Sequence, residues 1–268
     1  MTALAKELFD AYTSGSRVDV APTSRDGGCD LATAYAVEAE LTAMRRAEGR
    51  TTVGRKIGAA NRAVWRALKI KTVLWGNMYD DTVHYAENGT APVSLARMRA
   101  PKLEPEVVMK LKSVPTSFDP AAVLGCVEWL ALGYELVDNP FPDWKFRAED
   151  LVASFGFHAA LVVGTPVPVE AANIASLVDQ LATFTVRLSK NGELAAEGGG
   201  KNVLESAAIC MGEFASAIAA QPGAEPLRPG EIVTTGTLTP PPPIAAGARW
   251  EVVASGINLP SLTIDLKP

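Results

Sequence analysis

The stretch Leu103-Glu-Pro-Glu-Val-Val-Met-Lys-Leu111 has the alternation of a β-strand, because every second residue from its start is apolar or proline. This phase places Glu104 and Glu106 side by side on the other face of the strand. Two neighbouring carboxylates repel each other, and hard divalent cations such as Mg²⁺ or Mn²⁺ prefer carboxylate oxygens as ligands. The pair therefore indicates a metal site, with a solvated strand face as the alternative.

Composition and charge bound the class of protein. The 268 residues suffice for one large domain, or one and a half. A net charge of −5 argues against a nucleic-acid surface, and no apolar run approaches the roughly 20 residues of a membrane span. Residues 1–10 mix charged and apolar side chains, so they lack the apolar region of a signal peptide. Three widely spaced cysteines suggest neither a disulfide framework nor a zinc site, and we expect a cytoplasmic protein.

The pattern along the chain predicts an α+β protein. A helix is expected after the N-cap Asp30, a strand over residues 52–57, a short helix over residues 61–68 and a polar loop over residues 73–89. The later part is β-rich. Its expected elements are a helix from Asp119-Pro120 toward Trp129, a strand over 134–137, a hairpin at Asn191-Gly192, a helix over 203–219 and strands over 231–266. We expect an α-rich portion over residues 1–75 and a catalytic β portion over residues 76–268.

Further candidate residues lie outside the acidic strand. Glu135, in Gly133-Tyr-Glu-Leu-Val-Asp138, has the phase to project into the same cleft, or else to lie exposed on its strand. Lys56 lies in Gly54-Arg-Lys-Ile-Gly58, where flanking glycines allow close approach to an anion, although a surface lysine is the commoner explanation. The threonine-rich run around Thr237 either holds a carboxylate or forms a simple bend.

The chain has only two histidines. His158 lies in an apolar stretch, so we expect a buried structural role. His84 lies in the expected polar loop with Glu87 three residues on, which suits a general base with an orienting carboxylate, or else a solvated side chain. The same loop contains Asp80, a candidate substrate-binding residue, and we expect the loop to close over a bound substrate as a lid.

Taken in order, these segments resemble the 2-keto-4-pentenoate hydratase and 4-oxalocrotonate decarboxylase branch of the fumarylacetoacetate hydrolase superfamily. The likeness extends over most of the chain, through Gly54-Arg-Lys-Ile-Gly58, Pro101-Lys-Leu-Glu-Pro-Glu106, Tyr134-Glu-Leu-Val-Asp138, Asp143-Trp144, Leu227-Arg-Pro-Gly-Glu-Ile-Val233 and Thr235-Gly-Thr-Leu-Thr239. The resemblance implies a mixed β-roll with a helical N-terminal portion. It also implies that Glu104, Glu106 and Glu135 ligate Mg²⁺ or Mn²⁺, that Lys56 serves the substrate's carboxylate or enolate, and that the turn at Thr237 lines the same pocket.

The resemblance has one departure. Hydratases of this branch carry an Asp-Asn-Ala-Ser stretch, whereas this chain reads Asp150-Leu-Val-Ala-Ser-Phe-Gly-Phe-His158, in which apolar residues replace most of the polar ones. The metal chemistry is unaffected, but the reaction at the far end of the substrate is left open.

The implied chemistry starts from a small 2-oxo acid that chelates the cation, which stabilises the enolate as a Lewis acid. We expect a hydratase acting in aromatic catabolism. A C–C hydrolase of the acylpyruvate or maleylpyruvate type, a decarboxylase of the 4-oxalocrotonate type, and a catalytically silent small-acid binding protein are the alternatives. A homo-oligomer is expected by default.

Overall fold

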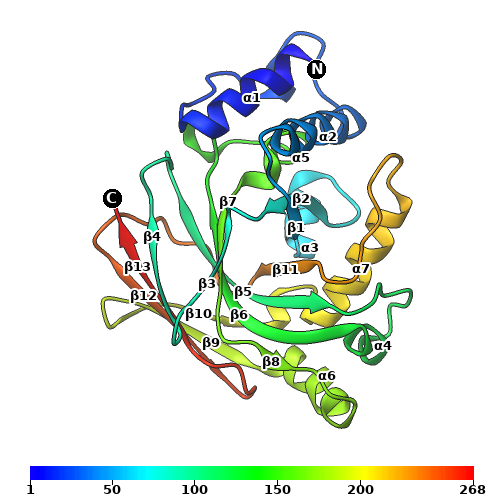
Figure 1. Cartoon of the computed structure of the whole chain (residues 1–268), viewed down its shortest axis with the longest axis vertical. Helices are drawn as coiled ribbons and strands as arrows, with labels where there is room; N and C mark the ends of the chain where they lie inside the picture. Colours follow the sequence, from blue (N-terminus) through cyan, green and yellow to red (C-terminus); the bar gives the residue numbers. More distant parts are fainter.

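The computed structural model describes residues 1–268 as two curled β-sheets with helices at one end and along one side (Figure 1). The larger sheet has the order β2-β1-β11-β5-β6-β7-β3, with β8 paired to β6, and the smaller has the order β10-β9-β12-β13-β4. The strands are β1 (Thr52–Gly58), β2 (Leu74–Tyr79), β3 (Val83–Tyr85), β4 (Thr90–Ser94), β5 (Lys102–Leu111), β6 (Val127–Val137), β7 (His158–Val163), β8 (Val167–Pro168), β9 (Thr185–Lys190), β10 (Glu193–Gly199), β11 (Ile232–Thr237), β12 (Arg249–Ser255) and β13 (Leu262–Lys267).

The pairing is mostly antiparallel, and only β1 with β11, β3 with β7 and β4 with β13 run parallel. The α-helices are α1 (Ala3–Ser14), α2 (Leu31–Ala47), α3 (Arg62–Leu68), α4 (Pro120–Gly125), α5 (Ala148–Val152), α6 (Ile174–Thr183) and α7 (Ala207–Ala220). The predicted α+β class with a helical N-terminal portion is confirmed.

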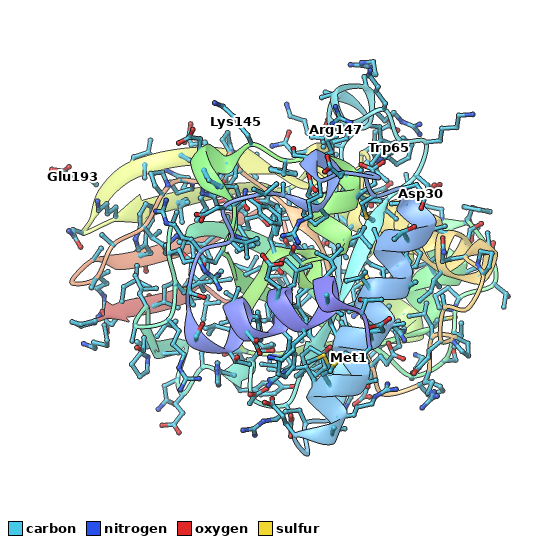
Figure 2. The ribbon with its side chains drawn as sticks, turned by 90° about the horizontal axis from the view of Figure 1, so that it is seen from above. Met1, Asp30, Trp65, Lys145, Arg147 and Glu193 are labelled. Carbon is cyan, nitrogen blue, oxygen red and sulfur yellow. The ribbon has the colours of Figure 1, made fainter.

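The N-terminal helices lie across one end of the molecule, and the β9–β10 hairpin projects at the other. Figure 2 shows the hairpin residue Glu193 far from Asp30, which begins α2. The Asp30 side chain accepts a hydrogen bond from the N–H of Thr33, as expected of an N-cap, and Arg45 and Arg46 lie in the last turn of α2. The hairpin prediction at Asn191-Gly192 is also confirmed, since these two residues connect β9 to β10.

Strand β1 joins the helical portion to the sheet that carries the acidic strand. Gly54 makes this possible, because a Cβ there would come within 1.8 Å of the carbonyl oxygen of Ile232 on β11. Lys56 is then registered opposite Thr234. Since β1 and β2 both belong to the larger sheet, the N-terminal portion and the β-roll share strands, and a division at residue 75 cuts through β2.

Three predicted boundaries are wrong. Residues 73–89 are no polar loop but contain β2 and β3, and all six residues of β2 are buried, because this edge of the sheet is covered on both faces. The helix at Pro120 ends at Gly125, and Trp129 lies in β6, which starts at Val127, well before residue 134. Helix α7 starts at Ala207, where the Ser206 hydroxyl accepts from the N–H of Ala208.

The segment Gly200–Ala220, which ends with α7, is the one candidate for a membrane span by length and composition, and 56% of its most apolar window is buried inside the molecule. This burial is typical of a core helix.

Candidate active site

Three carboxylates meet on the inner face of β5 and β6. The antiparallel register sets Glu104 directly opposite Glu135, and Glu106 follows two residues along β5 on the same face. One oxygen from each carboxylate lies within 4.8 Å of the others. Glu106 and Glu135 are fully buried, and Glu104 is half-buried. The structure therefore brings the three predicted ligands together.

Lys56 reaches this cluster from β1. Its Nζ lies 3.3 Å from Oε2 of Glu135 and donates a hydrogen bond of 3.0 Å to the carbonyl of Gly156. That carbonyl belongs to the turn Phe155–Phe157, whose three residues all have positive φ, at 56°, 61° and 60°. Such backbone is strained for aromatic residues and occurs where the surrounding structure requires it. Here the turn presents a carbonyl to the lysine.

Gly236 holds the second carboxylate. Its N–H donates to Oε2 of Glu106 at 2.6 Å, with the backbone at φ 105°. A Cβ at this position would lie 2.4 Å from the Cβ of Ala60, so only glycine fits. The register shift between Thr234 and Thr237, where β11 pairs with β5, turns this N–H toward the carboxylate.

His158 holds the third carboxylate. Its Nδ1 lies 2.9 Å from Oε1 of Glu135, and its Nε2 lies 2.9 Å from the hydroxyl of Thr82. The predicted burial of His158 is confirmed. The sequence analysis did not predict its contact with Glu135. The contact depends on the pairing of β6 with β7, and the short apolar stretch around His158 does not reveal which strand it pairs with.

The cluster shifts the pKa values of its members in opposite directions. Burial raises the pKa of Glu104 to about 7, and the Glu135 charge adds to the shift although Lys56 opposes it. Burial and the charges of Glu135 and Glu104 raise the pKa of Glu106 well above its ordinary value. Burial also disfavours the charged form of Glu135, but Lys56 and His158 outweigh it and lower the pKa of Glu135. With all three carboxylates ionised the cluster would carry more negative charge than the Lys56 ammonium balances, and the raised pKa values of Glu104 and Glu106 express this repulsion together with their burial.

A divalent cation fits this arrangement. Oε1 of Glu106 and Oε2 of Glu135 are buried without a hydrogen-bond partner, and the latter has only the ion pair with Lys56. Unsatisfied buried oxygens are costly, and a cation would satisfy both. A set of three carboxylates is the oxygen-only donor set that Mg²⁺ or Mn²⁺ prefers.

The cluster opens into a cavity of about 530 Å³. Lys56, Glu104, Gly236 and Thr237 border it at the acidic end. Much of the remaining wall is apolar, and its members include Val64, Leu68, Trp144, Phe146, Leu151, Phe157, Pro240 and Pro241.

The departure around Asp150 has a structural explanation. The Asp150 carboxylate is buried and accepts hydrogen bonds from the N–H and hydroxyl of Thr23 and from the N–H of Arg147. It therefore fixes the fold near α5, while Leu151 and Phe157 of the same segment contribute apolar surface to the cavity.

Three predicted site residues lie elsewhere. His84 and Glu87 are exposed on and just after β3, and Asp80 is exposed in the turn after β2, where it accepts from the N–H of Thr51. None of the three lines the cavity. The expected lid is instead built into the sheet, because β3 pairs with β7. Of the residues predicted to bind substrate, Thr237 and Lys56 do line the cavity.

Residues 71–264 match the family described as fumarylacetoacetate (FAA) hydrolase C-terminal, and the chain belongs to this family. It is similar to 2-hydroxyhexa-2,4-dienoate hydratase of Comamonas testosteroni, with 29% identity over 231 residues, which cover 85% of this chain and 84% of that protein. It is also similar to 2-keto-4-pentenoate hydratase of Burkholderia vietnamiensis, with 27% identity over 265 residues, 96% of this chain and 95% of that protein. The resemblance seen in the sequence is confirmed.

Solved structures share the fold. 4-Oxalocrotonate decarboxylase from Pseudomonas putida G7, complexed with magnesium and adipate, has a TM-score of 0.86 and 23% identity over 98% of this chain and 96% of that chain. Fumarylpyruvate hydrolase from Pseudomonas aeruginosa, in complex with Mn²⁺ and pyruvate, has a TM-score of 0.56 and 17% identity over 80% of this chain and 88% of that chain. At these identities the likeness is one of fold.

Proposed function

We propose that this chain is a divalent-metal-dependent hydratase, a lyase that adds water to a small 2-hydroxydienoic acid, the enol form of a 2-oxo acid. The observation that carries the proposal is the meeting of three carboxylates and a buried lysine at one end of a largely apolar cavity. The similarity to a 2-hydroxyhexa-2,4-dienoate hydratase and to a 2-keto-4-pentenoate hydratase supports the same reaction class.

Glu104, Glu106 and Glu135 would hold Mg²⁺ or Mn²⁺. When bound, the cation supplies a Lewis acid for the 2-oxygen and carboxylate of the substrate. The protein's own part is to fix the ligands, through the N–H of Gly236 on Glu106 and the imidazole of His158 on Glu135.

In the cluster without a cation, Lys56 is held in its protonated form. Burial disfavours its charge, but the carboxylates of Glu135, Glu104 and Glu106 outweigh that cost and raise the pKa of Lys56. It therefore acts as a hydrogen-bond donor to the substrate's oxygen and not as a base. Negative charge that develops on that oxygen is stabilised by an ammonium already in place.

The rest of the cavity suits a short hydrocarbon chain and one added water. Leu151 and Phe157 exclude bulk solvent from the unsaturated carbons. The hydroxyl of Thr237 donates to the carbonyl of Thr239 at 2.8 Å, which leaves its own lone pairs to accept from a water or substrate hydroxyl. The pair His84 and Glu87, predicted as the base of a C–C hydrolase, is exposed and does not line the cavity.

A turnover panel tests the proposal. The protein is assayed with Mg²⁺, and again after chelation, on 2-hydroxypenta-2,4-dienoate, an acylpyruvate and 4-oxalocrotonate. We expect metal-dependent loss of the dienoate absorbance and little conversion of the other two. Faster cleavage of the acylpyruvate or faster release of carbon dioxide would overturn the hydratase assignment, but the assignment of the metal site would still hold. No turnover by the metal-loaded protein would favour a binding protein.

A further inference from the structure

A second cavity, of about 200 Å³, shares no lining residue with the active-site cavity. It is bordered by α1, α2, the turn after β2, the segment before β5 and the start of β7. His158, whose Nδ1 contacts Glu135, also borders it. The volume corresponds to roughly six water molecules, so the cavity suits a small ion and not a drug-sized ligand.

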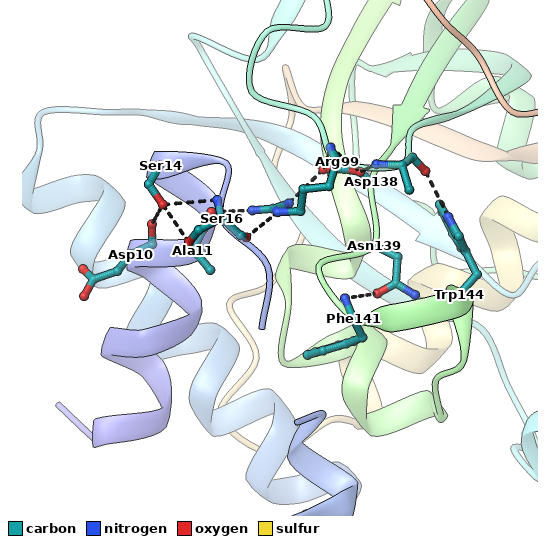
Figure 3. A network of polar contacts seen from close by, with 10 residues as sticks. Asp10, Ala11, Ser14, Ser16, Arg99, Asp138, Asn139, Phe141 and Trp144 are labelled. Carbon is teal, nitrogen blue, oxygen red and sulfur yellow. Dashed lines mark hydrogen bonds and ion pairs between the residues drawn. The ribbon is translucent and has the colours of Figure 1, made fainter. Parts of the chain in front are cut away.

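One wall of this cavity is an arginine whose charge is already paired. The Asp138 carboxylate lies 2.8 Å from Nη1 of Arg99. The same guanidinium donates to the carbonyls of Ala11 and Ser16, next to the end of α1, as Figure 3 shows. Asp138 therefore leaves no free negative charge that would repel an anion in the cavity.

A second wall is an arginine with one free donor. Nη2 of Arg45 donates to both oxygens of Asp81, at 2.6 and 2.7 Å, and Nη1 pairs with Glu48 at 2.9 Å. Asp81 also lies 3.3 Å from Nε of Arg50. Arg45 is only 4% exposed, yet its Nε is buried without a hydrogen-bond partner. A buried donor without a partner is costly, and an acceptor in the cavity would satisfy it.

Two further donors border the cavity without partners. The Arg97 guanidinium makes no ion pair and no hydrogen bond. The Tyr12 hydroxyl makes no hydrogen bond either, and burial raises the pKa of Tyr12 to about 12, so it stays protonated and able to donate. Among the groups that line the cavity or pair with its lining, four guanidinium groups meet three carboxylates. The charge of Arg97 is the one left uncompensated.

We propose that this cavity binds a small oxyanion of the size of phosphate. Its oxygens would accept hydrogen bonds from the guanidinium of Arg97, from Nε of Arg45 and from the hydroxyl of Tyr12. These donors belong to α1, to α2 and to the segment 95–101 between β4 and β5. A bound anion would therefore hold the two N-terminal helices against the sheet. The site goes beyond the proposed reaction and does not depend on it.

Phosphate binding to the metal-free protein tests this site. Inorganic phosphate is titrated in a calorimeter in the presence of a chelator, so that no metal ion in the active site can bind it. Thermal melts with phosphate are compared with melts in NaCl of the same ionic strength. We expect saturable binding of phosphate and a rise of several degrees in melting temperature, because the anion binds the folded state alone. NaCl should have little effect.

Three variants locate the bound phosphate. Arg97→Gln should weaken binding roughly ten-fold or more, as for the loss of a charge-assisted hydrogen bond. Tyr12→Phe keeps the ring, whose centroid lies 4.2 Å from that of Phe155, and removes only the hydroxyl, so it should weaken binding by about three- to ten-fold. Arg66→Gln is the matched control. Arg66 is an exposed arginine of α3 that likewise makes no ion pair and no hydrogen bond, and its replacement should leave the affinity unchanged.

Three results would overturn the assignment. The first is the absence of phosphate binding up to roughly 10 mM, a concentration at which even a site of millimolar Kd is mostly filled. The second is wild-type affinity in both Arg97→Gln and Tyr12→Phe, since the phosphate would then bind elsewhere. The third is equal stabilisation by NaCl, which would reduce the effect to general screening of charge.

Discussion

The Lys56 ammonium lies 3.3 Å from Oε2 of Glu135, although β1 and β6 are separated in the sheet by β11 and β5. Both side chains are almost fully buried, with exposed fractions of 4% and 0%. A buried ion pair adds little to stability on average, because desolvation offsets the attraction. A gain in folding stability therefore does not explain why the Lys56–Glu135 ion pair lies beside two further carboxylates. A role of this pair in the chemistry of the cavity does explain it.

The first prediction concerns Glu106. Glu106→Gln removes one charged ligand but keeps its shape, so the affinity for Mg²⁺ should fall by roughly 10²-fold or more, beyond the 10–100-fold of an outer-sphere change. The metal-free variant should melt at the same temperature as the wild type or higher, because repulsion within the cluster is relieved. Calorimetric Mg²⁺ titration and thermal melts measure both. Glu193→Gln, at the exposed hairpin, is the control. Wild-type Mg²⁺ affinity in Glu106→Gln would remove this residue from the ligand set.

A second prediction concerns Lys56. Lys56→Ala should lower kcat by roughly 10²-fold or more, as for the loss of one oxyanion donor. Lys56→Arg should restore little, because a planar guanidinium does not fit beside the carbonyl of Gly156 as an ammonium does. Steady-state kinetics with saturating Mg²⁺ provide the measurement. Unchanged kcat in both variants would show that the ammonium does not act on the substrate.

The pH dependence of stability gives a third prediction. Burial raises the pKa of Glu104 from near 4.5 to about 7 in the folded protein without metal. A raised folded-state pKa contributes stability below the unfolded value, and this contribution is lost as the pH rises through 7. The metal-free protein should therefore melt at a lower temperature at pH 8 than at pH 5.5.

Added Mg²⁺ should reverse this trend, because the cation binds the ionised carboxylates and stabilises the folded state most at pH 8. Glu104→Gln should reduce the metal-free dependence between pH 5.5 and 8 and leave the part that the raised pKa of Glu106 contributes. Thermal melts at the two pH values, with chelator and with Mg²⁺, make the comparison. A metal-free protein more stable at pH 8, with no added effect of Mg²⁺ there, would contradict the account.

The fourth prediction compares two glycines of positive φ. Gly236→Ala should cost about 1–2 kcal/mol for the backbone and more for the contact with Ala60, and it should weaken Mg²⁺ binding by displacing the N–H from Glu106. Gly247→Ala has a similar φ, 85°, but open space around the added Cβ, so only the backbone cost should appear. Denaturant unfolding separates the two costs, and equal effects on stability and Mg²⁺ affinity would remove Gly236 from the site.

The fifth prediction contrasts the two histidines. His158→Gln should weaken Mg²⁺ binding by about 10–100-fold, because the imidazole contacts Oε1 of Glu135 and so fixes the orientation of this carboxylate. His84→Gln should change neither Mg²⁺ affinity nor turnover, because that side chain is exposed and lies outside the cavity lining. A sharp loss of turnover in His84→Gln with unchanged metal binding would return the base role to His84 and favour the C–C hydrolase.

The alternation of side chains along single strands was enough to predict much of the site. Glu104 and Glu106 share a face because of local alternation, and Glu135 has the matching phase on its own strand, so their meeting followed from two short patterns. Lys56 was found through its flanking glycines, one of which the parallel contact with β11 does require.

The wrong predictions share one cause, which is the pairing of strands that lie far apart in the sequence. β2 pairs with β1, and β3 pairs with β7. Residues 73–89, which the sequence predicted as a polar loop, therefore contain two strands of the larger sheet. His84 lies exposed on β3, and the pairing of β6 with β7 brings His158 beside Glu135, whereas the sequence indicated His84 as the candidate base and only a buried structural role for His158.

Anomalous diffraction from a crystal grown with Mn²⁺ would locate the metal ion in this protein. The account predicts one strong peak between the carboxylates of Glu104, Glu106 and Glu135, with oxygen ligands at about 2.0–2.2 Å, near the distances of a hard octahedral cation. A peak elsewhere, or none at a Mn²⁺ concentration that supports turnover, would contradict the metal site and the hydratase built on it.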